Sequence, residues 1–113
     1  MPTYYRMQRP EDDPERLLDP DEQYTEPWGD THRVREGVSV FPDLDALYRY
    51  MVSNGADVEL GTQVVTLEGE PSEDRDFDAD EGAMLVHPTK IVRIDPVDRD
   101  RLQELIPPGR SPA

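Results

Sequence analysis

The clearest pattern of apolar and polar positions along the chain lies in residues 37–55. Its first part is a short run of β-forming residues between Gly37 and Pro42, which is how a buried strand is bounded. Its second part has apolar residues three and four positions apart, so it predicts an amphipathic helix. Asp43 is suited to cap the start of this helix, and Asn54-Gly55 is suited to end it. The apolar stripe consists of Leu44, Leu47, Tyr48, Met51 and Val52.

Several shorter segments predict the strands on which this helix packs, because a helix of its length is marginal alone in water. Residues 3–7 and 62–67 are rich in aromatic or β-branched side chains and predict two strands. Residues 83–86 and 91–94 predict two further short strands, and residues 87–90 predict a hairpin turn that joins them.

A second helix is predicted nearer the C-terminus. Asp95 is a good helix cap, and Pro96 fits the first helical position, after which apolar residues recur to about residue 106. The whole pattern predicts an α+β fold, with two helices on a small, mostly antiparallel sheet. We expect one domain over residues 1–107 and a disordered tail over residues 108–113.

Residues 10–36 predict a long, irregular arm that is extended and rich in loops. Residues 10–27 of this arm are acidic and are interrupted by prolines, which cut the chain into short elements, whereas residues 29–36 are the most basic segment of the chain. Asp13 as a cap and Pro14 at the first position predict one helical turn within it. Few apolar side chains in the acidic part of the arm are present to anchor it to the body of the protein. They are Leu17, Leu18, Tyr24 and Trp28.

Charge narrows the range of functions more than any motif does. The chain has 113 residues, of which 26 are acidic and 12 are basic, so its formal net charge is −14. A surface this negative repels nucleic acid phosphates and anionic membranes, and we expect direct binding to neither. It favours a basic protein as the partner. The same composition is also compatible with a salt-adapted domain that has no special partner.

Carboxylates are concentrated in residues 73–82, where acidic side chains at alternate positions suggest a calcium loop. The match to an EF-hand fails, because a loop that starts at Asp76 has Glu81 at the glycine position and His87 at the bidentate position. A looser, weak ion site and a solvated acidic loop are the two remaining interpretations. The second is the expectation, so we predict no metal site here and expect these side chains to contact the basic partner. The predicted contact residues are Asp74, Asp76, Asp78, Asp80 and Glu81.

The remaining features argue against several other classes of protein. The absence of cysteine excludes disulfides and thiol chemistry and fits a reducing compartment. No apolar leader and no apolar run of membrane-spanning length is visible, so we expect a cytoplasmic location. No complete catalytic constellation or phosphate-binding loop is apparent. The leading expectation is therefore a non-enzymatic interaction protein that needs no cofactor.

Three segments occur in an order that resembles a known enzyme family. Residues 4–6 (Tyr-Tyr-Arg) form a strand with a basic residue, and residues 37–41 (Gly-Val-Ser-Val-Phe) lead into a helix. Residues 81–88 then carry an acid just before a pair of predicted strands. This order is similar to that of a small ADP-ribosyltransferase, and the resemblance spans most of the chain.

The resemblance implies an alternative function, that of an ADP-ribosyltransferase-like NAD-binding protein. In that family a basic residue on the first strand, a serine and a late glutamate frame the nicotinamide, and Arg6, Ser39 and Glu81 occupy the corresponding places. Two positions depart from the family pattern. Val40 follows the serine where a second hydroxyl residue is expected, and Ala83 stands in place of a second acid.

Overall fold

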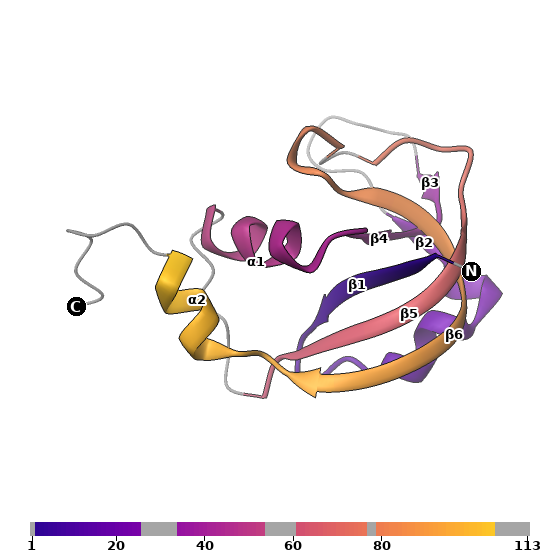
Figure 1. Cartoon of the computed structure of the whole chain (residues 1–113). Coiled ribbons are helices and arrows are strands. Elements are labelled where there is room, and N and C mark those ends of the chain that lie inside the picture. The colour runs from indigo at the N-terminus through magenta and orange to yellow at the C-terminus, as the bar shows by residue number, and fades with distance from the viewer. Residues whose placement is uncertain (1, 26–33, 54–60, 77–78, 106–113) are drawn as a thin grey trace.

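The computed structural model describes residues 2–25, 34–53, 61–76 and 79–105, and the predicted tail over residues 108–113 lies outside them (Figure 1). The α-helices are α1 (Leu44–Ser53) and α2 (Arg99–Leu105), and the 3₁₀-helices are η1 (Pro14–Leu18), η2 (Pro20–Glu22) and η3 (Ala79–Glu81). The strands are β1 (Thr3–Gln8), β2 (Tyr24–Thr25), β3 (Arg35–Glu36), β4 (Val38–Val40), β5 (Gln63–Pro71) and β6 (Met84–Pro96). This content confirms the predicted α+β class.

The main sheet is antiparallel and curls until its two outer strands meet. Its strand order is β1-β5-β6-β4, and each neighbouring pair is antiparallel. The chain just after β4 returns to β1, where the backbones of Tyr5 and Phe41 exchange two hydrogen bonds of 2.8 Å each. The curvature of β5 and β6 around β1 is visible in Figure 1. The sheet is thus closed at this point.

Two apolar clusters lie on opposite faces of the curled sheet, because successive side chains of a strand point to opposite faces. Tyr5 and Met7 of β1 belong to the cluster that α1 and α2 cover, and Tyr4 belongs to the other. The second cluster takes buried side chains from all four strands and from Leu17 of η1. Its most deeply buried members, with no exposed surface, are Val40, Val65, Leu67 and Val86.

Helix α1 lies where the sequence predicts it. Asp43 caps its start, since the backbone N–H of Asp45 donates to Asp43 Oδ1 at 2.9 Å. Leu47, Tyr48 and Met51 are all 3% exposed or less and pack against the sheet. The predicted strand and amphipathic helix of residues 37–55 are therefore confirmed for the part of that stretch that the structure describes.

The predicted hairpin turn at residues 87–90 is wrong, because β6 is one continuous strand that passes through it. The pairing of β5 with β6 shifts register at Thr66/Leu67 and again at Glu68/Gly69. Such β-bulges bend a strand strongly without ending it. Pro88 lies opposite Gly69, directly at the second shift, so the residue that suggested a turn marks a bend in a continuous ladder.

The second helix begins later than predicted. The expected cap Asp95 is still part of β6, where it pairs with Val64 of β5, and Pro96 also belongs to that strand. The actual cap is Asp98, whose Oδ1 accepts a hydrogen bond from the backbone N–H of Arg101 at 3.1 Å. Pairing with β5 therefore keeps the chain extended past the local helix signal.

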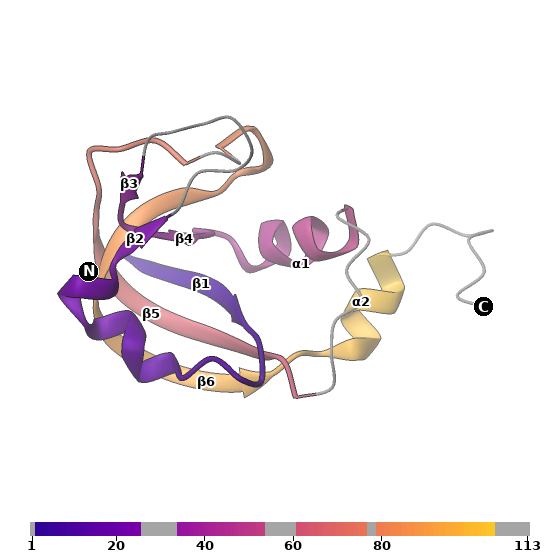
Figure 2. The same ribbon diagram turned by 180° about the vertical axis from the view of Figure 1, so that it is seen from behind.

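The arm contains η1, η2 and a small ribbon in which β2 pairs with β3. The predicted helical turn is confirmed as η1, where Asp13 Oδ1 accepts from the backbone N–H of Glu15 at 2.9 Å. Of the predicted anchors, Leu17 is buried, but Leu18 and Tyr24 are 38% and 48% exposed. Trp28 lies outside the described residues. Only one apolar anchor thus holds the described part of the arm, and η1 packs against β6 (Figure 2).

A buried glutamine supplies the other attachment of the arm. Gln23 is 8% exposed, and its Nε2 donates to the carbonyls of Leu17, at 2.9 Å, and Pro88, at 3.0 Å. The backbone carbonyl of Gln23 accepts a hydrogen bond from the backbone N–H of Gly37 at 2.9 Å. One polar residue therefore ties the arm to β6 and to the turn before β4.

Candidate interaction site

A groove of about 560 Å³ opens between β3, the residues that follow β5, and the first half of β6. We call it the acidic groove, because three of its lining side chains are carboxylates and no lysine or arginine is among its described lining residues. The lining residues are Val34, Glu36, Pro71, Ser72, Glu73, Asp74 and His87.

A hydrogen-bond network centred on Ser72 builds the wall of this groove. The Ser72 N–H donates to the Leu85 carbonyl at 2.9 Å, and its Oγ donates to the Glu36 carbonyl at 2.7 Å. The Asp74 N–H donates to Ser72 Oγ at 3.1 Å, while Asp74 Oδ2 accepts from the Glu36 N–H at 2.8 Å. Three segments that are distant in sequence are thereby fixed to one another.

His87 lies in the same groove and has a defined tautomer. The amide nitrogen of Gln23 faces two carbonyls, so the oxygen of that amide must face His87 Nδ1, which lies 3.2 Å away. An amide oxygen only accepts hydrogen bonds, so Nδ1 carries the proton. In the neutral ring Nε2 is then an acceptor. The contact with Gln23 therefore holds the His87 ring in place at the groove.

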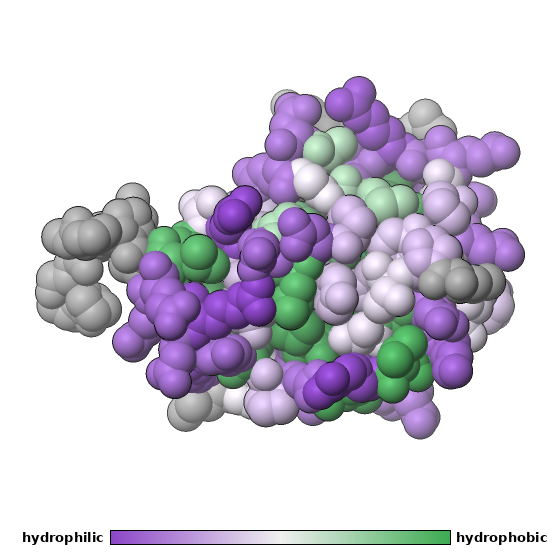
Figure 3. Space-filling view, in the orientation of Figure 1, coloured by the Kyte–Doolittle hydropathy of each residue, from purple (hydrophilic) through white to green (hydrophobic). Residues whose placement is uncertain are grey.

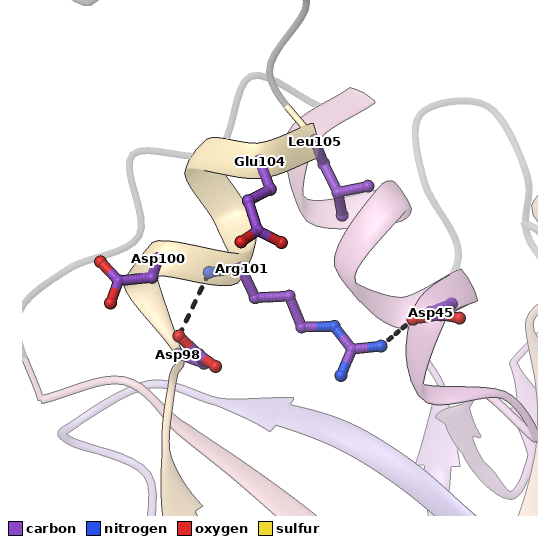
Figure 4. A pocket seen from close by; sticks show the side chains of 6 residues that line it. All are labelled: Asp45, Asp98, Asp100, Arg101, Glu104 and Leu105. Carbon is purple, nitrogen blue, oxygen red and sulfur yellow. Dashed lines mark hydrogen bonds and ion pairs between the residues drawn. The ribbon is translucent and has the colours of Figure 1, made fainter.

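A second pocket, of about 360 Å³, lies between α1 and α2, and Figure 4 shows its side chains. It too is rich in carboxylates, but it also holds an arginine. The guanidinium of Arg101 forms an ion pair with Asp45 of α1 and lies 4.9 Å from the centre of the Tyr48 ring. The remaining lining residues are Asp98, Asp100, Glu104 and Leu105.

The structure separates the predicted partner-binding carboxylates. Asp80 and Glu81 are exposed on η3, and Asp80 lies 3.8 Å from an arginine nitrogen of Arg75. Asp74 is half-buried and holds the Glu36 backbone, while Asp76 is only 6% exposed. Asp78 lies outside the described residues.

Arg6 and Ser39, two of the residues singled out by the family resemblance, are in contact. Arg6 Nη1 donates to the Ser39 carbonyl at 2.8 Å, and its Nε donates to Gln8 Oε1, also at 2.8 Å. Ser39 lies on β4 opposite Leu85. Glu81 is on η3, at the approach to β6.

The guanidinium of Arg6 is enclosed by the protein. Burial lowers the pKa of Arg6 from its ordinary value, and the carboxylates of Asp12 and Asp76 act in the opposite direction. Alternation along β1 places Arg6 on the same face as Tyr4, next to the cluster that all four strands share. The positive charge is thus used inside the fold, where it links β1 to β4.

Several other arginines are paired with carboxylates of the same chain. The hydrogen bond from Arg16 lowers the pKa of Glu22, and Arg93 Nε lies 2.7 Å from Asp95 Oδ2. These pairs use up part of the small number of positive charges. The side chains that are left without such an ion pair are therefore mainly carboxylates. In Figure 3 hydrophilic residues cover α2 and the upper edge of the molecule, with an apolar strip between them.

Comparison of the chain with protein-family models, with curated proteins and with solved structures found no match in any of the three. In the part of the chain that the structure describes, no three acidic, histidine or cysteine side chains are grouped as a metal ion requires. The same described residues include no helix with the length and apolar character needed to cross a bilayer.

The sequence interpretation missed Glu36, Ser72 and His87 as site residues. They lie on β3, after β5 and on β6, so they are brought together only by the pairing of distant strands. The sequence predicts a turn at His87, whereas the continuity of β6 places this residue in the groove. A serine two residues before an aspartate is a weak local signal of the turn that carries Ser72 and Asp74.

Proposed function

We propose that this protein is a non-enzymatic interaction protein that binds a basic protein partner. The proposed contact surface consists of the acidic groove, which includes Glu73, together with the exposed carboxylates of Asp80 and Glu81 on η3. The net charge of −14 brings a cationic partner to the molecule from a distance, and the groove supplies a local place for its side chains.

The observation that carries this proposal is the acidic lining of the groove, which includes Glu36, Glu73 and Asp74 and, among its described lining residues, no lysine or arginine. In the pocket between α1 and α2, by contrast, Arg101 already pairs with Asp45. The groove is therefore the better candidate for a cation that comes from another molecule.

An oligoarginine peptide is the simplest probe of this function. We expect it to bind in about 50 mM salt and to bind at least about tenfold more weakly in about 300 mM salt, because exposed charges are screened. Fluorescence anisotropy with a labelled peptide measures both affinities. An oligoglutamate peptide of the same length is the control, and it is expected not to bind.

A pair of variants with equal net charge tests whether the binding is local. The triple variant Glu73→Gln/Asp80→Asn/Glu81→Gln is expected to bind the peptide more weakly than Asp21→Asn/Asp100→Asn/Glu104→Gln. All six replaced side chains are exposed, and both variants lose three negative charges. Equal losses in the two variants would contradict the proposed surface, and no binding by the unmodified protein would contradict the function itself.

The contact between Arg6 and Ser39 supports a second candidate, an ADP-ribosyltransferase-like NAD-binding protein. Two of the three residues that the resemblance requires are joined by a 2.8 Å hydrogen bond between β1 and β4. The third, Glu81, is exposed on η3. In this candidate, Glu81 supplies the carboxylate beside the bound nicotinamide.

A thermal-shift titration with NAD tests the second candidate. If it is correct, NAD raises the melting temperature of the protein, because a ligand that binds only the folded state stabilises it. Transfer of a labelled ADP-ribose group is then expected to disappear in Glu81→Gln, while Asp100→Asn, on the exposed side of α2, retains it. An unchanged melting temperature at millimolar NAD excludes this candidate.

A further inference from the structure

We infer that the acidic groove receives an arginine side chain of the basic partner. This inference rests on the proposed function and names the chemical group that the groove takes. Four observations support it: the acceptors that line the groove, its apolar wall, the hydrogen bonds that fix its wall, and the position of Arg101 in the other acidic pocket.

The polar groups offered to a ligand are mainly hydrogen-bond acceptors. The carboxylates of Glu36 and Glu73 come from different segments, and His87 lines the groove beside them. A ligand that matches several acceptors in different walls needs several donors and no acceptor. Arginine has five N–H donors in a planar fork, whereas lysine has a compact ammonium group with three.

The groove also has an apolar side. Val34, which is 51% exposed, and Pro71 are both part of the lining. Long cationic side chains bury their methylene stems on apolar surface while the charged head remains among polar groups. The combination of an apolar wall with carboxylates therefore fits the whole length of an arginine side chain, and it fits a bare metal cation poorly.

The groove is built before any ligand arrives. The hydrogen bonds of Ser72 to Glu36 and Leu85, and that of Asp74 to Glu36, already fix the wall. Binding energy is consequently not spent on ordering these segments, which is the usual benefit of a preorganised site.

The pocket between α1 and α2 provides an internal comparison (Figure 4). It is also lined by carboxylates, and in it the guanidinium of Arg101 pairs with Asp45 and lies over the ring of Tyr48. The chain thus fills one acidic pocket with its own arginine. The acidic groove is also lined by carboxylates, and no arginine is among its described lining residues.

The inference is tested by NMR with three small probes added to the full chain: the amide of N-acetyl-arginine, that of N-acetyl-citrulline and that of N-acetyl-lysine. The chain has two histidines, so the ring signal of His87 is assigned by its absence in His87→Gln. The arginine amide is expected to shift this signal with saturation. Citrulline has the same shape without the charge and is expected to leave it unchanged, and the lysine amide is expected to bind several-fold more weakly.

Matched variants locate the binding. The double variant Glu36→Gln/Glu73→Gln is expected to bind the arginine amide at least about tenfold more weakly, because it loses charge-assisted hydrogen bonds. Asp100→Asn/Glu104→Gln changes the net charge equally and is expected to change the affinity by less than about twofold. Equal losses in both variants, equal shifts with the citrulline or lysine amide, or no shift at all would each overturn the inference.

The two proposals can fail separately. If the oligoarginine peptide binds but the His87 signal does not respond to the arginine amide, the groove is not the arginine site and the general function stands. If neither probe binds, both the groove and the function are wrong.

Discussion

Replacing Leu47 with alanine is expected to lower the free energy of unfolding by about 2–5 kcal/mol, the usual cost of removing a buried leucine side chain. Leu47 is 2% exposed and lies in the cluster between the sheet and the two α-helices. Its loss leaves a cavity that the surrounding strands close only in part. Urea denaturation followed by circular dichroism measures the change, with the slope against urea as a check on the folded state.

Leu18→Ala is the matched control for this substitution, because the chemistry is the same and only the burial differs. Leu18 is 38% exposed on η1. We expect its replacement to cost less than about 1 kcal/mol, in line with partly exposed positions elsewhere. Similar losses for Leu18→Ala and Leu47→Ala would contradict the placement of α1 on the sheet.

Gly37→Ala is expected to lower the free energy of unfolding by about 2–4 kcal/mol, from backbone strain together with crowding. The φ angle of Gly37 is +107°, a region that side chains other than glycine rarely adopt. An added Cβ also lies 3.1 Å from Leu85 Cβ, Ser72 Cβ and the Val86 carbonyl oxygen. Thermal and urea unfolding both measure this change.

Gly82→Ala separates the strain from the crowding. The φ angle of Gly82 is +97°, similar to that of Gly37, but the nearest atom to an added Cβ is Ala46 Cβ at 3.7 Å, an ordinary contact. We therefore expect Gly82→Ala to cost about 1–2 kcal/mol, the strain alone. A larger loss in Gly82→Ala than in Gly37→Ala would be inconsistent with the tight junction of β4, β6 and the Ser72 turn.

Elements with local signals could be predicted from the sequence. Helix α1 has an apolar stripe and Asp43 as a cap, and η1 has Asp13 and Pro14, so both were located correctly. The errors lie where pairing between distant residues overrides the local signal. Asp95 is held against β5 in place of capping a helix, and Pro88 is carried through a bend in β6.

The candidate site is harder to predict from the sequence than the fold is. Composition pointed to the loop after β5, but it could not distinguish Asp76, which is buried, from Asp80, which is exposed. The groove itself depends on the meeting of Glu36, Ser72 and His87, which requires the strand order to be known. Gln23 could not be identified either, because a polar residue in a polar arm gives no sign that it will be buried.

The meeting of Tyr5 and Phe41 also has a consequence at high protein concentration. An open sheet has two outer strands whose free backbone groups can recruit another chain and start fibril growth. Here the two outer strands are joined by the hydrogen bonds between Tyr5 and Phe41. The part of β6 that lies beyond its pairing with β4 faces the bulges in the β5–β6 ladder, which make it a poor template for another strand. Geometry therefore opposes fibril formation alongside the mutual repulsion of highly charged molecules.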